Sequence, residues 1–189
     1  MILSDKDIKV AVHQGRIKIT PFDEQLVDSS GLGIRINSQF RIFKKIAHDW
    51  LDPFEDQDIH TELIEKKEEG FLLQPGEFVL ASSKEYLAMP NDLAARLIPR
   101  NSLSRLGIIL VGSAGIVEPG FEGNLTFTIG NISKIPVLLR ENMHFCKLVF
   151  EPLSSSAEIP YHLQRGSKYN LQKGPVASRL HLEKELKMS

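Results

Sequence analysis

The chain has 189 residues, a formal net charge of −1 and 42% hydrophobic residues, which is typical of a globular protein that can bury a substantial core. The near-neutral charge argues against general nucleic-acid binding, because that activity needs a concentrated basic surface. The apolar runs are too short to span a bilayer, no secretory signal is visible, and the one cysteine, Cys146, allows no internal disulfide. We therefore expect a cytoplasmic protein with no membrane partner.

The N-terminal residues predict one short helix. Ser4 is a favourable N-cap, and Asp5 and Asp7 lie in the first turn, where negative charge is stabilised. Gly15 is a suitable C-terminal stop, so we expect the helix within residues 4–14.

The acidic segment at residues 49–58 shows no helical period. A metal-binding loop is one interpretation of its carboxylates, but no spacing of metal ligands stands out. A solvated excursion between elements is therefore the better interpretation.

From Phe71 onward the pattern is typical of short β-strands. Residues 124–129 alternate cleanly, with Leu125, Phe127 and Ile129 on one face of the predicted strand. This pattern predicts an all-β sandwich or barrel. Further strands are expected at residues 78–81, 135–139 and 145–150, with a type II turn at residues 118–121.

Several common chemistries are excluded by missing residues. Zinc-dependent base deamination needs a His and two Cys, or three Cys, around the metal, and the chain has one cysteine. There is no P-loop, no Gly-x-Ser-x-Gly elbow, and no pair of histidines at helical i, i+4 spacing. Any phosphate recognition must therefore use another kind of site.

The block at residues 99–107 is the most informative stretch. It places Arg100 and Arg105 among hydroxyl and amide side chains after a predicted strand. Guanidinium groups and exposed backbone N–H groups suit a polyphosphate. A helical turn whose arginines pair with nearby carboxylates is an equally good interpretation from the residues alone.

Several motifs, in the same order along the chain, resemble the dCTP deaminase family. They are the opening residues 1–8, the block at 99–107, the segment 114–123 that this family shares with dUTPases, the strand at 148–153 and the segment 168–179. The likeness covers nearly the whole chain and is weakest between residues 21 and 70.

The resemblance implies an all-β fold, a distorted jelly roll or dUTPase-like β-sandwich with a short N-terminal helix and an extended C-terminal arm. We expect residues 1–160 to form the nucleotide-binding domain and residues 161–189 to form an arm that closes over the ligand. The implied ligand is a pyrimidine deoxynucleoside triphosphate with Mg²⁺ and without zinc. The implied assembly is a homotrimer with each site at a subunit interface.

The family motifs also imply which residues contact the nucleotide. The implied contacts are Arg100, Ser102 and Arg105 from the central block, Ser113, Ala114 and Gly115 from the segment after it, and Lys168, Tyr169 and Gln172 from the arm.

The chain departs from the family where catalysis is expected. Thr128 occupies the position of the catalytic glutamate, and a threonine hydroxyl cannot act as a base near neutral pH. Asn101 replaces a serine that supports the attacking water.

Two other carboxylates are possible replacements for the missing base. Glu118 stands where dUTPases and bifunctional relatives carry an aspartate, and its extra methylene shifts the carboxylate by about 1.5 Å. A misplacement of about 1 Å can cost on the order of a hundredfold in rate. Glu122 is the other candidate, although an exposed turn residue is the simpler interpretation. The catalytic candidates are thus Glu118, Asn101 and Thr128.

Three functional hypotheses remain open at this point. The first is a divergent deaminase that converts dCTP to dUTP and ammonia. The second is a dUTP diphosphatase-like hydrolase that uses Glu118, and the third is a non-catalytic trimeric protein that binds nucleotides.

Overall fold

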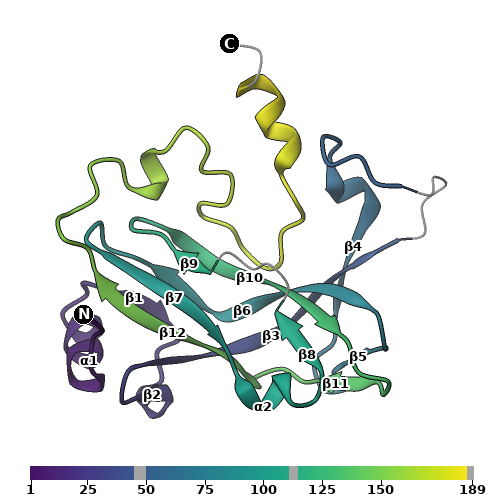
Figure 1. Ribbon diagram of the computed structural model, residues 1–189, viewed down its shortest axis with the longest axis horizontal. Coiled ribbons are helices and arrows are strands. Elements are labelled where there is room, and N and C mark those ends of the chain that lie inside the picture. Colours follow the sequence, from purple (N-terminus) through teal and green to yellow (C-terminus); the bar gives the residue numbers. More distant parts are fainter. Residues whose placement is uncertain (45–49, 111–114, 187–189) are drawn as a thin grey trace.

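The computed structural model of the chain describes residues 1–44, 50–110 and 115–186 and has the predicted all-β architecture (Figure 1). No helix in these ranges is long and apolar enough to cross a membrane. The elements are α1 (Asp5–His13), β1 (Lys18–Thr20), η1 (Glu24–Leu26), β2 (Val27–Asp28), β3 (Gly31–Phe43), η2 (Gln57–His60), β4 (Thr61–Glu65), β5 (Phe71–Leu73), β6 (Phe78–Ala88), β7 (Leu93–Pro99), α2 (Asn101–Ser104), β8 (Ile108–Leu110), β9 (Ile116–Val117), β10 (Glu122–Asn131), β11 (Val137–Leu139), β12 (His144–Pro152), η3 (Tyr161–Leu163) and η4 (Leu180–Leu186).

The predicted N-terminal helix is confirmed as α1. The Ser4 hydroxyl accepts a hydrogen bond from the Asp7 backbone N–H at 3.3 Å, as an N-cap should. Ile8 and Ala11 on its inner face are buried in the core. The chain leaves the helix through Gly15, whose φ of +71° explains the glycine.

Strand β3 connects two halves of a curled antiparallel sheet. Within the described residues the sheet runs in the order β8, β10, β6, β3, β12, β7, β9, with β1, β2 and β4 paired alongside. The first half of β3 pairs with β12, while its second half pairs with β4 and β6. The core lies inside the curl, where the buried rings of Phe127 and Phe145 stack with centroids 5.3 Å apart.

Strand β10 shows the predicted alternation. Leu125 and Phe127 are buried in the core, and the intervening Asn124, Thr126 and Thr128 lie on the outer face and are partly exposed. The outer face of β10 therefore carries short polar side chains along a rigid strand.

The predicted turn before β10 is also confirmed. The Phe121 N–H donates to the Glu118 carbonyl at 3.1 Å, and Gly120 has a φ of +76°. A Cβ at Gly120 would lie only 2.7 Å from both Pro160 and His162. The turn is thus the place where the chain packs back against itself after β12.

The C-terminal residues differ from the extended arm that was expected. They include two short 3-10 helices, η3 and η4, and the second of these stands out from the body of the molecule near the C-terminus (Figure 1). Residues 180–186 contain neither glycine nor proline, so local hydrogen bonds can close a helical turn there. Residues 164–179, between the two helices, have the irregular extended path that was predicted.

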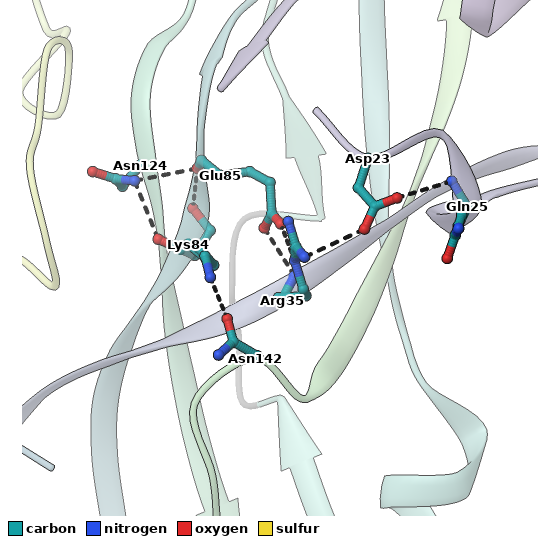
Figure 2. Close-up of polar contacts among 8 residues, drawn as sticks. Asp23, Gln25, Arg35, Lys84, Glu85, Asn124 and Asn142 are labelled. Carbon is teal, nitrogen blue, oxygen red and sulfur yellow. Dashed lines mark hydrogen bonds and ion pairs between the residues drawn. The ribbon is translucent and has the colours of Figure 1, made fainter. Parts of the chain in front are cut away.

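A buried ion pair joins β3 to β6 (Figure 2). The Glu85 carboxylate, with 2% of its side chain exposed, accepts from the Arg35 side-chain Nε at 2.7 Å and from the Arg35 backbone N–H at 2.9 Å. Asp23 lies 3.5 Å from the same guanidinium. A buried charge must be paired and hydrogen-bonded, and both Glu85 oxygens meet this condition.

The ion pair lies beside a register shift between β6 and β10. At this irregularity the Ser83 hydroxyl accepts from the Leu125 N–H at 2.8 Å and donates to the Glu85 carbonyl at 2.7 Å. The Asn124 amide donates to the carbonyls of Ser83 and Glu85 at 3.1 and 3.2 Å. Side chains thus satisfy backbone groups that a regular ladder would have paired.

We expect Glu85→Ala to lower the free energy of unfolding by about 3–5 kcal/mol, because Arg35 would lose its buried partner. Asp92→Ala is the control, since the Arg16–Asp92 pair is partly exposed and should contribute roughly 1 kcal/mol or less. Urea unfolding at one fixed protein concentration measures both. Equal losses in the two variants would contradict the role given to Glu85.

Candidate functional site

A cavity of about 480 Å³ lies between the sheet and the C-terminal residues. Much of its wall is apolar, with polar groups contributed by β10, by the turn before it and by the arm. Its lining residues are Phe43, Phe78, Leu80, Leu97, Ile116, Val117, Glu118, Phe121, Leu125, Thr126, Thr128, Tyr161, Tyr169, Gln172, Val176, Ala177 and Ser178. An apolar pocket with a few convergent polar groups is typical of a small-molecule site.

Backbone groups of the arm form hydrogen bonds with residues on the outer face of β10. Asn124 donates its N–H to the Gln172 carbonyl at 3.0 Å and accepts from the Gly174 N–H on its side-chain oxygen at 3.3 Å. The Thr126 hydroxyl accepts from the Val176 N–H at 3.3 Å. The polar face of β10 therefore determines where the arm lies over the cavity.

Gly123 allows the arm to approach β10 closely. It forms a parallel bridge with Gln172, and a Cβ there would lie 3.0 Å from the Gln172 backbone. Its φ of +143° is a further reason for glycine at this position.

Glu118 is the one carboxylate that lines the cavity among the residues described. The Gln164 side-chain amide donates to its Oε2 at 2.9 Å, which holds the carboxylate in place. Burial, with a further contribution from the Glu118 charge, raises the pKa of the neighbouring Tyr161 phenol. The Tyr161 hydroxyl stays protonated near neutral pH and accepts from the Tyr169 N–H at 3.2 Å.

Glu122, the other candidate base, does not line this cavity. Its carboxylate accepts a hydrogen bond from the Tyr86 hydroxyl at 3.1 Å on another part of the surface. Burial and this hydrogen bond raise the pKa of Tyr86. The interpretation of Glu122 as a residue outside the site is therefore favoured.

Thr128 and Gln172 both line the cavity, as a site role would require. Gln172 is 93% buried, with its amide nitrogen 2.5 Å from the Asn124 carbonyl, while its Oε1 has no hydrogen-bond partner among the described residues. A buried acceptor without a partner costs free energy, and a ligand donor or a bound water would remove that cost.

Lys168 has an internal partner in this conformation. Its ammonium group, on a side chain with 16% exposure, pairs with the Glu183 carboxylate of η4. Arg179 binds Lys168 and Tyr169, since its guanidinium donates to the Lys168 carbonyl at 2.5 Å and its N–H donates to the Tyr169 hydroxyl at 3.1 Å. A phosphate that binds Lys168 would therefore share or compete for this ammonium group with the Glu183 carboxylate.

The central block does not reach this cavity within one chain. Asn101 and Ser102 lie on α2, Arg100 and Arg105 flank it, and none of them lines the cavity. In Figure 1, α2 lies at the bottom of the molecule, whereas the arm lies at the top. The structure thus places the two predicted halves of the phosphate site at opposite ends of the molecule.

The two interpretations of the central block are each correct in part. Residues 101–104 do form a helical turn, as the simpler interpretation holds. Arg100 and Arg105 are exposed, however, and neither forms an ion pair with any residue that the structure describes. These arginines remain available for an external anion.

Three predicted contacts belong to the segment between β8 and β9. Ser113 and Ala114 lie outside the described residues. Gly115 is exposed, and its carbonyl accepts from the Leu97 N–H at 3.0 Å.

Sequence reasoning did not identify the apolar wall or the residues that hold the arm. Phe43, Phe78 and Leu80 come from β3 and β6, and nothing local marks them as lining residues. Asn124 and Thr126 did carry a signal, because the alternation of β10 placed them on one polar face.

Comparison with known proteins gives a consistent result. The family model described as dCTP deaminase-like matches residues 2–153. A protein of Streptomyces avermitilis named "dCTP deaminase, dUMP-forming" is 42% identical over 184 residues, covering 96% of each chain. A protein of Methanobrevibacter smithii with the same name is 43% identical over 192 residues, covering 98% of each.

A solved structure supports the fold alone. The 2'-deoxycytidine 5'-triphosphate deaminase of Agrobacterium tumefaciens superposes with a TM-score of 0.64 at 20% identity, covering 81% of this chain and 49% of that chain. With the family model matching most of its length and relatives above 40% identity along nearly all of it, this chain belongs to the dCTP deaminase-like family.

Proposed function

We propose that this chain hydrolyses dCTP to dUMP, with release of ammonia and pyrophosphate. The observation that carries the proposal is the cavity that Glu118, Thr128, Tyr169 and Gln172 all line, in a chain 42% identical to a protein named dUMP-forming dCTP deaminase. The product replaces the dUTP that was expected from the motifs, because the relatives compared are named dUMP-forming.

The proposed reaction consumes two waters. The oxygen of one water replaces the amino group at C4 of the cytosine. The oxygen of the other attacks the α-phosphorus, and pyrophosphate leaves with the bridging oxygen. The dUTP-hydrolase hypothesis thereby becomes the second half of one reaction. Each attack needs a group that accepts a proton from water.

Glu118 is the group that we assign to this proton transfer. It is the carboxylate that lines the cavity in the described part of the chain, and Gln164 orients it. The Thr128 hydroxyl can position a water molecule but cannot remove its proton near neutral pH. The buried Oε1 of Gln172 can accept a hydrogen bond from the cytosine ring or from a bound water.

The site residues are compatible with Mg²⁺ that arrives with the triphosphate. Mg²⁺ usually keeps several waters and is bound through substrate phosphates with few protein ligands, and no cluster of metal ligands is present among the described residues. Glu118 and the unpartnered Gln172 Oε1 are the oxygens that would accept from its waters. When bound, the ion neutralises charge on the phosphates. No zinc is part of the proposal.

We further propose that a complete site needs two copies of the chain, in a homotrimer. The support is the position of α2, whose flanking arginines are exposed and unpaired in the described structure and lie far from the arm of the same chain (Figure 1). Arg100, Ser102 and Arg105 of one copy would contact the phosphates beside Lys168, Tyr169 and Gln172 of another.

A non-catalytic nucleotide-binding role is the second candidate. It is favoured by Thr128, which stands in the cavity at the position of the family glutamate. In that case the cavity and the cationic residues would bind the triphosphate without turnover.

Glu118→Gln should lower kcat on dCTP by about 10²–10⁴-fold, the usual contribution of general base catalysis. Chromatography of the products, with Mg²⁺ present, measures the rates of dUMP and dUTP formation separately. Glu122→Gln is the matched control, because that carboxylate lies outside the cavity and should leave kcat unchanged. An unchanged rate in Glu118→Gln would show that the base is elsewhere.

Thr128→Glu distinguishes the two candidate functions. If the remaining site is competent, the added carboxylate should raise dCTP deamination at least about tenfold, within the range of an added general base. Wild-type protein that binds dCTP in calorimetry and forms no product would instead support the binding role. Absence of binding to any pyrimidine triphosphate would contradict both candidates.

Mixing two variants with weakened binding, assayed at a dCTP concentration below KM, tests the interface-built site. Arg105→Ala and Lys168→Ala should each weaken triphosphate binding about tenfold or more, because each removes a charge-assisted hydrogen bond. After the two are unfolded and refolded together, mixed assemblies contain some sites with both residues intact, so part of the activity should return. No recovery, or a monomer in size measurements, would contradict the two-copy site.

A further inference from the structure

Arg41 of β3 connects the arm to the acidic segment before β4. Its Nε donates to the Pro175 carbonyl of the arm at 3.0 Å. Its Nη1 donates to the Thr61 hydroxyl at 2.9 Å and lies 2.8 Å from the Asp58 carboxylate. The Arg41 side chain is 17% exposed and the Asp58 side chain 56%, so the guanidinium is largely buried while its counter-ion reaches it from the surface. Hydrogen bonds from a charged donor such as this are stronger than neutral ones.

The acidic segment is folded so that it presents Asp58 to this guanidinium. Gln57 is 95% buried, and its amide donates to the carbonyls of Asp52 and Glu55 at 2.7 and 2.9 Å. Asp56 accepts from the Asp58 N–H at 3.0 Å and so caps the short helix η2. Residues 50–60 are thus the largely exposed excursion that was expected, and within it the contacts of Gln57 and Asp56 hold Asp58 beside Arg41.

Pro175 lies between two arm residues that are bound by β10. The residues on either side, Gly174 and Val176, donate their N–H groups to side chains of β10, while a proline has no N–H to donate. Val176 and Ala177, which follow it, line the cavity. Arg41 thus fixes the arm from β3 between two points at which β10 fixes it.

We propose that Arg41 is a positioning residue that holds the arm closed over the cavity, and that the acidic segment supplies Asp58 as the counter-ion that orients it. The effect on turnover rests on the proposed function, whereas the effect on the arm itself does not. A purely structural Arg41 would stabilise the fold without controlling the arm, and the two roles differ in measurable ways.

The test compares Arg41→Met, Arg41→Lys and Asp58→Asn with a control, Arg16→Met, which removes an Arg–Asp pair of 2.7 Å that makes no hydrogen bond to residues 164–179 in the described structure. Trypsin cleavage after Lys173, an exposed residue of the arm, is followed without any ligand. The KM and kcat for dCTP and the thermal unfolding midpoint are measured on the same samples.

Arg41→Met should speed cleavage after Lys173 and raise KM, each by about tenfold, as expected for the loss of a charge-assisted hydrogen bond. The change in kcat should be smaller than the change in KM. Arg41→Lys should recover part of the effect, because a lysine keeps the charge but not the guanidinium fork. Asp58→Asn, a milder change that leaves Arg41 in place, should give an intermediate result, and Arg16→Met should match the wild type.

Two outcomes would overturn the proposal. In the first, Arg41→Met lowers the unfolding midpoint while cleavage after Lys173 keeps its wild-type rate. In the second, Asp58→Asn behaves as the control. If the wild-type protein shows no turnover, the proposed function fails, but the cleavage rates still decide the role of Arg41.

Discussion

The alternation of side chains along β10 is the constraint on which both the core and the site depend. Each second residue packs into the core, so the residues between must face outward in a fixed register. Asn124 and Thr126 use this register to bind backbone groups of the arm, and Thr128 lines the cavity. Strand β10 therefore determines the positions of both the arm and Thr128.

The rigidity of that strand depends on polar contacts behind it. The Arg35–Glu85 pair and the Asn124 amide lie beside each other there (Figure 2). With the Ser83 hydroxyl, they satisfy backbone groups where β6 and β10 lose register. Asn124 belongs to both systems, because its amide nitrogen binds β6 and its amide oxygen binds the arm. Asn124 thus links the strand that carries Glu85 to the arm by direct hydrogen bonds.

Local patterns predicted the parts of the fold that local physics determines. The α1 helix, the alternating strand at residues 124–129 and the turn at Gly120 follow from caps, period and turn chemistry within a few residues. The long strand β3 was not predicted, although its buried residues alternate along most of its length; the buried polar Ser38 stands in that alternation where an apolar residue would mark a core face. The Arg41–Pro175 contact joins residues 134 positions apart, and no local signal marks such a pair.

The candidate site was predictable as a set of residues but not as an arrangement. Family motifs named Glu118, Thr128, Tyr169 and Gln172, which the fold does bring to one cavity. The same motifs named Arg100 and Arg105, yet their separation from the arm becomes visible only in three dimensions. The pairing of Lys168 with Glu183 balances that ammonium charge within the chain itself. By Coulomb's law a polyphosphate competes with a single carboxylate for Lys168 more strongly than a singly charged anion does.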